Sequence, residues 1–530
     1  MVLLTIACGT IYYFLRVPQY LHGVPAVPLS KVMEWAYRRT PPRDQFLEVQ
    51  QFYADHDTFI IWNGGAWRLM TANDEHAREI FARTNDIIEK VTPNANHPNS
   101  MFRRFVGNSL AFAHSRDWRR IRRMVSPAFH QASPAQIMGD TVRRMFTALV
   151  RDFPSLRAGI NGQACTVAMD AYLGRLTMDI LGRTVYGYDF RSLENPDSKY
   201  AVLLASIVDQ LCNPLYILFP WLDNLPGFRR RQLAAMIAEL DGLLFGVIER
   251  KRRDLAVSAP IVDPTRADLL TLMLQAYVAA DRRISTGPSA PTSPPLLPLT
   301  GQELRDNAVV FYLAGQETTA GALGFWMYTM AQHPEVQAKA RTEVQSILGE
   351  GKYDPHDRIP TDEQLRSLVY VAASLHENLR LNPPFATMVA RETVVPQIIA
   401  GQVSVPANVR VGIHIMALQR SPTNYGPDAN VFRPERFLEG ASRGSHYGAG
   451  VSAYSVKRLV NGSFFPFGGG ARQCIAKNFS MLEQKMVASM LLRKYEWSLD
   501  YGPRGEDPVY SPPFALNRPQ NLRLVMRALY

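Results

Sequence analysis

One long helical pattern, from Thr300 to Gln332, constrains the fold of this 530-residue chain more than any other feature. Thr300 and Glu303 have the spacing of a capping box at its start, and His333-Pro334 ends it. At 1.5 Å per residue, a helix of this length measures about 45 Å, enough to cross a whole domain. The other segments must pack around it, so we expect a fold built mainly from helices.

The rest of the chain alternates further helical patterns with short apolar runs that are typical of strands. "SLVYVAASLHENLRLNPP" and "IAKNFSMLEQKMVASMLLRKY" predict helices, whereas "MVARETVV" and "VRVGIHIMAL" predict strands. The stretch between Asp281 and Thr300 is rich in Pro and Ser and predicts a surface loop. No internal repeat or long linker divides the remainder. We therefore predict a single large domain, mainly α with small β-sheets.

The cysteines and the charge exclude several classes of protein. Cys8, Cys165, Cys212 and Cys474 lie far apart, which argues against a disulfide framework and favours a reducing, cytosol-facing compartment. A structural zinc site needs paired ligands at short spacing, and Cys474 has no such neighbour. The net charge of +11 suits an anionic membrane or an acidic protein partner. Because the arginines are scattered and form no basic tail, we expect no nucleic-acid partner.

Cys474 closes the unusual stretch "FFPFGGGARQC". A phosphate-binding loop would end in Gly-Lys-Ser/Thr or follow a strand as Gly-x-Gly-x-x-Gly, and this stretch does neither. A cysteine just before a helix is favoured as a thiolate by the free N–H groups and the dipole of that helix. Arg472 adds positive charge, and Phe467 is placed to cover the sulfur. The pattern favours a single thiolate ligand to a heme iron; a buried structural cysteine in a tight turn is the alternative.

Phe467-x-x-Gly470-x-Arg472-x-Cys474 resembles the heme-binding signature of the cytochrome P450 superfamily. Ala476 stands where that signature usually has a second glycine. The resemblance implies that Cys474 is the axial ligand of the iron of heme b, iron protoporphyrin IX. It also implies that Arg472 holds a heme propionate.

Two further patterns resemble landmarks that support the cysteine loop in this superfamily. "HENLRL" contains Glu377-x-x-Arg380, and "FRPERF" contains Arg436. Glu377 and Arg380 fall on one helix face, where an exposed pair would contribute very little. The resemblance implies instead a buried network of Glu377, Arg380 and Arg436. Replacing one member of such a network strongly lowers the stability of the fold, because it leaves a buried charge without its partner.

"AGQETT", Ala314 to Thr319, places poor helix formers in the middle of the long helix. The hydroxyl of Thr318 can bond back to the carbonyl of Ala314 and loosen the helix locally. Glu317 and Thr318 match the acid–alcohol pair of the superfamily. That match implies that the carboxylate relays protons and that the hydroxyl holds the oxygen being activated. On its own, the pattern would equally describe a simple helix kink.

"SRDWRRIRRMV" contains Trp118 and Arg122 one helical turn apart. In the superfamily, the matching residues both reach a heme propionate. The other arginines of the segment, Arg119, Arg120 and Arg123, are expected to form a solvated basic face. By resemblance, this helix also borders the surface that receives electrons from an acidic flavoprotein, so the cluster is a candidate for electrostatic steering.

The N-terminus predicts a membrane anchor. Residues 1–21 begin with an apolar run that is short for a full span of about 20 residues, and no signal-peptide cleavage site follows. We expect a short anchor over 1–21, a Pro/Gly hinge over 22–45 and a heme-thiolate domain over 46–530. A peripheral helix is the alternative to the anchor. Such an anchor fits the eukaryotic, fungal type of the superfamily at the endoplasmic reticulum membrane, with the catalytic domain facing the cytosol.

The resemblance covers about Thr40 to Tyr530 and implies a helical prism fold and a monooxygenase. Such an enzyme inserts one oxygen atom from O2 into a lipophilic substrate, with electrons supplied by NADPH through a membrane-bound flavoprotein reductase. We expect a role in secondary-metabolite biosynthesis, on a terpenoid or polyketide skeleton. Hydroxylation of a fatty acid or another lipid is the second choice. A heme protein that is an electron carrier or a sensor belongs to a different class, and it would not need Glu317 and Thr318.

Overall fold

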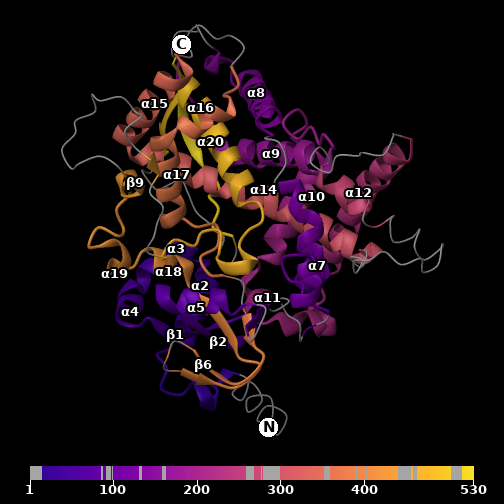
Figure 1. The fold of residues 1–530 in the computed structure, drawn as a ribbon, viewed down its shortest axis with the longest axis vertical. Helices are drawn as coiled ribbons and strands as arrows, with labels where there is room; N and C mark the ends of the chain where they lie inside the picture. The colour runs from indigo at the N-terminus through magenta and orange to yellow at the C-terminus, as the bar shows by residue number, and fades with distance from the viewer. Residues whose placement is uncertain are drawn as a thin grey trace, which may run out of the picture.

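A helical part and a sheet part make up the fold, which is mainly α (Figure 1). The computed structural model describes residues 15–84, 88–90, 97, 99–129, 134–157, 163–257, 268–275, 277, 299–350, 358–388, 391–399, 401, 403–439, 455–456, 462–502 and 516–529. In Figure 1 the helices gather in the upper part around α14, and β1 and β2 lie below with the N-terminal helices. The predicted surface loop between Asp281 and Thr300 falls almost entirely outside the described residues.

The helices of the described residues range from one turn to nearly nine. They are α2 (Leu29–Arg38), α3 (Pro42–Glu48), α4 (Gln50–Asp55), α5 (Asp74–Ala82), α6 (Met101–Val106), α7 (Ser115–Val125), α8 (Ala135–Asp152), α9 (Met169–Leu181), α10 (Lys199–Leu211), α11 (Pro214–Leu218), α12 (Arg231–Val257), α14 (Gly301–Gln332), α15 (Pro334–Leu348), α16 (Asp362–Ser367), α17 (Val369–Leu381), α18 (Ile415–Gln419), α19 (Pro422–Tyr425) and α20 (Lys477–Lys494). The helices predicted around Thr300, Glu377 and Cys474 correspond to α14, α17 and α20.

The central helix α14 begins as its sequence predicts. The hydroxyl of Thr300 accepts the N–H of Glu303 at 3.1 Å, and the Glu303 carboxylate accepts the N–H of Thr300 at 2.8 Å. The first half of α14 packs with α7, α10 and α12, and the second half packs with α8, α9 and α20. Residues 313–315, between these two cores, border a cavity. The helix therefore supports both cores and carries the wall of the site.

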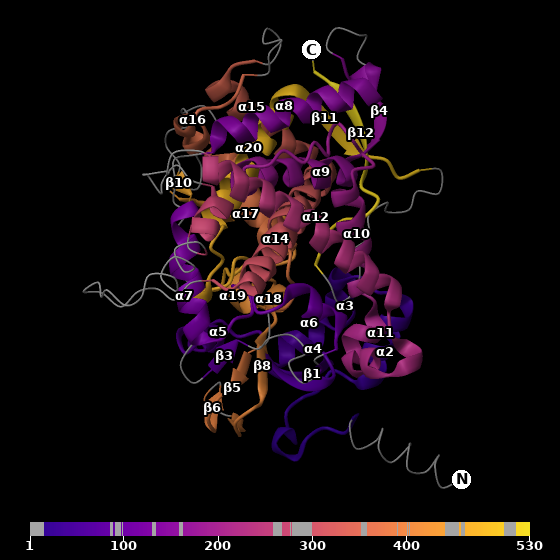
Figure 2. The ribbon, with the colours of Figure 1, turned by 90° about the vertical axis from the view of Figure 1, so that its right-hand side faces the viewer.

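Most of the strands form small sheets at the two ends of the molecule, and β10, which pairs with β9, lies at the side of the helical part (Figure 2). They are β1 (Thr58–Asn63), β2 (Ala66–Thr71), β3 (Ile88–Lys90), β4 (Cys165–Ala168), β5 (Arg391–Thr393), β6 (Gln397–Ile399), β7 (Val403–Val405), β8 (Arg410–Ile413), β9 (Leu438–Glu439), β10 (Ser455–Val456), β11 (Tyr495–Leu499) and β12 (Arg523–Ala528). The larger sheet has the order β1-β2-β8-β5-β3, in which β2 and β8 are parallel. Another sheet has the order β11-β12-β4.

The strand predicted over "VRVGIHIMAL" is only half right. Strand β8 ends at Ile413, and α18 begins at Ile415. The ring of His414 accepts the N–H of Ala417 at 3.1 Å and so caps the helix. A histidine is a weak capping signal in a sequence, which is why the apolar run looked like one strand.

The prediction of a hinge over residues 22–45 is wrong. Helices α2 and α3 occupy most of this range, and Val27, Val32 and Trp35 are buried against the sheet. The Trp35 indole also donates to Glu48 at 2.9 Å. The packed domain thus begins before residue 46. Of the predicted anchor over 1–21, residues 1–14 lie outside the described residues, and no helix of the described ranges has the length and apolar character needed to cross a bilayer.

Candidate active site

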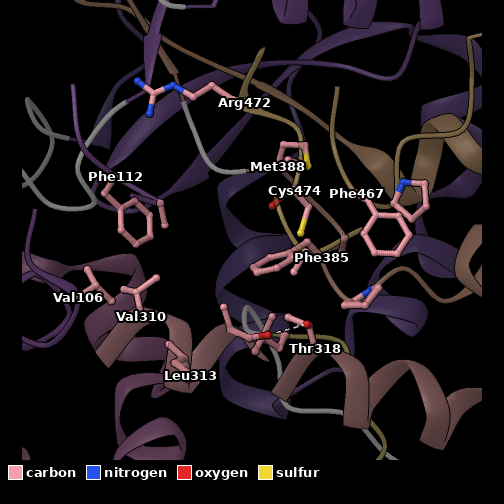
Figure 3. A pocket seen from close by; sticks show the side chains of 18 of the residues that line it. Val106, Phe112, Val310, Leu313, Thr318, Phe385, Met388, Phe467, Arg472 and Cys474 are labelled. Atoms are coloured by element: carbon pink, nitrogen blue, oxygen red, sulfur yellow. Dashed lines mark hydrogen bonds between the residues drawn. The ribbon is translucent and has the colours of Figure 1, made fainter. Parts of the chain in front are cut away.

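A cavity of about 570 Å³ lies between α14, α7, the loop that precedes α20 and the larger sheet. Its volume is in the range of small-molecule sites. Figure 3 shows apolar side chains around it, and they include Val106, Phe112, Val310, Leu313, Phe385 and Met388. Cys474 and Thr318 line the same cavity from two different elements. The site therefore joins one thiol and one hydroxyl to an apolar chamber.

The glycines before Cys474 let its loop lie close against α5. Gly468 and Gly470 have φ of 69° and 65°, a conformation that favours glycine. A Cβ on Gly470 would lie 2.4 Å from the carbonyl oxygen of Phe81. The N–H of Cys474 donates to the carbonyl of Phe467 at 2.9 Å, which closes the turn. The loop is thus held in one shape that leaves the sulfur facing the cavity (Figure 3).

The thiol of Cys474 is open to the cavity and is enclosed by protein atoms on its other sides. This burial raises its pKa, whereas the N–H of Ala476 and the positive charges of Arg122 and Lys90 lower it. A buried thiol with such neighbours suits a metal ligand, because the metal stabilises the thiolate further. The sequence prediction named Arg472 as the cation that favours the thiolate, whereas the charges that lower this pKa are those of Arg122 and Lys90, and burial outweighs them.

Cationic side chains surround the cavity next to the thiol. The guanidinium of Arg472 lies 4.3 Å from the ring centre of Trp118, and Arg122 Nη1 donates to the carbonyl of Gln473 at 3.1 Å. Burial and the neighbouring positive charges lower the pKa of Arg472 to about 9 and that of Lys90 to about 7. Bound carboxylates would offset these charges. The two propionates of a heme, beside a thiolate, fit this donor set. Lys90, on β3, belongs to no motif and was missed by sequence reasoning.

Thr318 lies where the sequence predicts. Its hydroxyl donates to the carbonyl of Ala314 at 2.7 Å, and α14 continues through this point (Figure 3). Gly315 allows α9 to pack closely against α14. A Cβ at this position would lie 2.5 Å from Leu181 Cδ1, which leaves no room for a side chain.

Glu317 is not brought to the cavity with Thr318. Its side chain is 2% exposed and forms an ion pair with Arg518 at 2.8 Å. Burial raises the pKa of this carboxyl, and Arg518 opposes that rise. The two residues of the predicted acid–alcohol pair therefore occupy different sides of α14. Successive helix residues point about 100° apart, so adjacency in the sequence did not imply a shared site.

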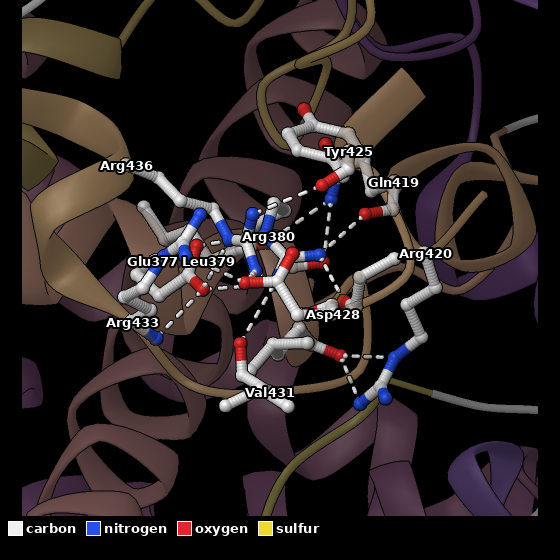
Figure 4. Close-up of polar contacts among 12 residues, drawn as sticks. Glu377, Leu379, Arg380, Gln419, Arg420, Tyr425, Asp428, Val431, Arg433 and Arg436 are labelled. Carbon is white, nitrogen blue, oxygen red and sulfur yellow. Dashed lines mark hydrogen bonds and ion pairs between the residues drawn. The ribbon is translucent and has the colours of Figure 1, made fainter. Parts of the chain in front are cut away.

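The predicted network of Glu377, Arg380 and Arg436 is present and buried (Figure 4). Arg380 donates to both carboxylate oxygens of Glu377, at 2.7 and 2.8 Å, and Arg436 Nε donates to one of them at 3.2 Å. The backbone N–H of Arg433 adds a bond of 2.9 Å. Neither Glu377 nor Arg380 has any exposed side-chain surface. The reading of Glu377 and Arg380 as an exposed helix pair is thereby excluded.

Gln419 and Tyr425 join this network to the cysteine loop. The amide of Gln419 donates to the carbonyl of Arg380 at 3.0 Å and accepts the N–H of Phe465 at 2.8 Å. The ring of Tyr425 lies under the guanidinium of Arg380, and its hydroxyl donates to Ser463. Sequence reasoning missed both residues, because only the folded chain brings them between the two parts.

A second buried polar group beside the cavity was also missed. Glu483 of α20 lines it, is 2% exposed, and has its pKa raised well above the usual range by burial. Nearby, Ser480 contacts the hydroxyl of Thr319 at 3.0 Å and accepts from Gln484 at 3.1 Å. Burial of this kind favours the neutral form of a glutamate, and the only signal in the sequence is a charged residue on the apolar face of a helix.

The basic face predicted for α7 is only partly solvated. Arg119 and Arg123 are exposed, but Arg120 pairs with Glu303 in the first turn of α14 and retains 13% exposure. This contact joins α7 to the central helix. Two of the three arginines are therefore exposed at the surface.

Comparison with known proteins agrees with the site. A family model described as Cytochrome P450 matches residues 22–525. The 11-oxo-beta-amyrin 30-oxidase of Glycyrrhiza uralensis is 29% identical over 463 residues, which are 86% of this chain and 79% of that protein. Cytochrome P450 734A1 of Arabidopsis thaliana is 27% identical over 449 residues, 83% of this chain and 75% of that protein. Cytochrome P450 monooxygenase xanG of Aspergillus fumigatus is 24% identical over 512 residues, 94% and 87% of the two chains.

Proposed function

This chain belongs to the cytochrome P450 family, and on that premise we propose that it is an NADPH-dependent monooxygenase of secondary metabolism whose heme iron is bound by Cys474. The observation that carries the proposal is the placement of a thiol and a threonine hydroxyl on one apolar cavity. Heme bound there supplies the activation of O2, and its thiolate ligand donates the electron density that favours O–O cleavage.

The residues of this chain have separate tasks in that reaction. Cys474 supplies the thiolate, and Phe467 keeps water from the sulfur. Arg122 and Arg472, with Trp118 and Lys90, hold the propionates through charge and hydrogen bonds. The apolar side chains opposite bind the lipophilic substrate and exclude water, which strengthens the electrostatic interactions inside the site.

The proposed role of Thr318 is to place its hydroxyl, as a hydrogen-bond donor, beside the oxygen that reacts. Its Oγ lines the cavity, and its bond to Ala314 is one that the hydroxyl can exchange for another acceptor. Glu317 supplies protons from the other side of α14, where burial raises the pKa of its carboxyl and favours the protonated form, while Arg518 opposes this rise. This part of the proposal requires the Glu317 side chain to leave its ion pair during turnover.

We expect Thr318→Ala to separate electron use from product formation. Alanine favours the helix, so the fold tolerates the change. Without the hydroxyl, the reduced oxygen leaves more often as hydrogen peroxide, and productive turnover falls by a factor on the order of 10². The measurement is product and peroxide formed per NADPH consumed.

The matched control is Thr329→Ala, on the same helix. Thr329 also donates to the carbonyl four residues earlier, Phe325, at 2.8 Å, and it is buried away from the cavity. It should keep the wild-type ratio of product to NADPH. An unchanged ratio in Thr318→Ala would leave that residue with a structural task only.

The substrate class proposed is a terpenoid or polyketide skeleton. The apolar walls support a lipophilic substrate, and the name of one relative gives 11-oxo-beta-amyrin as what it oxidises. Comparing the metabolites of cells with and without the gene tests the assignment. Accumulation of hydroxylated fatty acids only in cells that carry the gene would replace it with the second choice, a lipid hydroxylase.

The electron donor proposed is an NADPH-dependent flavoprotein reductase. The exposed arginines of α7, Arg119 and Arg123, give the surface near the cysteine loop a positive charge that attracts an acidic partner. Since exposed charges act over about 8–10 Å at physiological salt, the rate of reduction should fall as ionic strength rises.

The location proposed is the endoplasmic reticulum membrane, with the catalytic domain facing the cytosol. Exposed apolar side chains at residue 20, on α2 and on the chain from α11 to residue 228 support contact with a membrane surface. These side chains are Tyr20, Met33, Tyr37, Leu215, Trp221, Leu225 and Phe228. Helices α2 and α11 lie side by side (Figure 2).

Deletion of residues 1–14 is expected to make the protein extractable from membranes by carbonate and to leave heme binding intact. The deletion ends there because Trp67 donates to the carbonyl of Leu15 at 2.9 Å and Leu21 is buried. The measurement is fractionation of the truncated protein, with the full chain alongside. Truncated protein that stays in the membrane after the carbonate wash would contradict the anchor.

A further inference from the structure

Two arginines lie side by side at the sheet end of the cavity. Arg68 on β2 and Arg410 on β8 both line it. The two strands pair in parallel, with Leu69 beside Val411, so the arginines, each one residue earlier, are cross-strand neighbours on one face.

Both guanidiniums point to the turn that joins β1 to β2. Arg68 Nε donates to the carbonyl of Asn63 at 2.7 Å, and Arg410 Nη1 donates to the carbonyl of Gly64 at 3.0 Å. A guanidinium has five N–H donors, and among the described residues each of these two makes only that one hydrogen bond. The remaining N–H groups are available to a molecule in the cavity.

Among the described residues, only one carboxylate offsets the two positive charges of this pair. No described carboxylate lies within 4 Å of the Arg68 guanidinium, and Arg410 has only Glu392, at 4.0 Å. Like charges on neighbouring strands destabilise a sheet. Burial and the charge of Arg410 lower the pKa of Arg68 to about 9. An anion between the two guanidiniums would relieve this repulsion.

The other cations of the cavity already have anions assigned to them. Arg230 forms a two-point ion pair with Asp223, at 2.9 and 2.7 Å. The group near the thiol, with Arg122 and Arg472, is assigned to the heme propionates. Arg68 and Arg410 are left over, on a different wall of the cavity from the cysteine loop.

Resting on the proposed function, we propose that Arg68 and Arg410 bind a carboxylate of the substrate, which makes the substrate a lipophilic carboxylic acid. The planar guanidinium fork matches a carboxylate with two parallel hydrogen bonds. The apolar walls between the arginines and the thiol contact the carbon skeleton of the substrate. The charged end is fixed at the sheet, so the distance from the carboxylate selects which carbon lies beside Thr318 and Cys474.

The test is a set of binding titrations with the heme-loaded protein, followed by the heme absorption and, separately, by the rise in thermal midpoint. The probes are dodecanoic acid and abietic acid, each compared with its own alcohol. We expect at least one acid to bind about tenfold or more tightly than its alcohol. In Arg68→Gln and Arg410→Gln this preference should fall towards one. Arg68→Lys, which keeps the charge and loses the fork, should lie between.

The control variant is Arg527→Gln, which breaks an exposed pair with Glu496 far from the cavity and should keep the preference. The carbon-monoxide spectrum of each variant shows whether the thiolate heme is intact, so failure of the carboxylate site is distinguishable from failure of the monooxygenase assignment. The proposal is overturned if no acid binds more tightly than its alcohol, or if both Gln variants keep the full preference.

Discussion

Replacing Cys474 with alanine abolishes the red-shifted absorption band that a thiolate-bound heme gives when it is reduced and bound to carbon monoxide. The variant should also retain little heme, because the strongest bond between protein and iron is gone. Alanine fits the loop, whose shape depends on backbone bonds and on Gly470. The loss should therefore be one of ligation, without unfolding. The measurements are the spectrum and the heme content per mole of protein.

Cys212 provides the matched control, because it lines the same cavity. Burial raises the pKa of its thiol to about 12 although the charge of Arg518 lowers it, so this thiol stays protonated. Burial raises the pKa of Cys474 as well, but the N–H of Ala476 and the charge of Arg122 oppose that rise, and a bound metal would favour the thiolate further. Cys212→Ala should keep the band. A band that survives in Cys474→Ala and disappears in Cys212→Ala would reverse the assignment.

Local features of this site could be predicted from the sequence because short-range geometry determines them. The capping box of Thr300 and Glu303 and the bond from Thr318 to Ala314 each join residues three or four apart in one helix. The glycine-rich turn before Cys474 is equally local. The geometry of a helix or a turn alone fixes the distance between residues at such spacing, so the rest of the chain is not needed to predict the contact.

Features that depend on distant pairings could not be predicted in this way. Lys90 and Arg410 reach the cavity from strands whose neighbours are set by the sheet order, and an isolated arginine or lysine in a strand has no distinguishing signal. For Glu317, by contrast, the sequence did give a signal, but the position predicted from it was wrong. Its neighbour Thr318 suggested a shared site, whereas Arg518, about two hundred residues away, determines where its carboxylate lies.

The network around Glu377 shows how a motif of side chains supports backbone at a distance. Arg380 Nη1 donates to the carbonyls of Gln419 and Ala429, at 2.8 and 2.6 Å, besides its bonds to Glu377. A buried ion pair is often replaceable by apolar side chains. Here such a replacement would leave these carbonyls without donors, in a place with no exposed surface. The charged guanidinium of Arg380 therefore joins several backbone segments through its hydrogen bonds.

Glu377→Ala is accordingly expected to lower the free energy of unfolding by roughly 3–5 kcal/mol, because it leaves Arg380 and Arg436 buried without their carboxylate. Glu377→Gln, which keeps an acceptor oxygen but loses the charge, should lose less. Because Gln419 carries the network to Phe465, heme content should fall together with stability. The measurements are the denaturant midpoint and the heme content of each variant.

Glu496→Ala, which removes one side of an exposed pair with Arg527, is the control and should change little, because solvent screens such pairs. The heme readout separates the proposed task from general stability. If the network positions the cysteine loop, Glu377→Ala loses heme even at temperatures where the protein stays folded. Full heme content in a folded, destabilised Glu377→Ala would show that the network stabilises the helical core alone. The loop of Cys474 would then owe its shape only to its glycines and to their contact with Phe81.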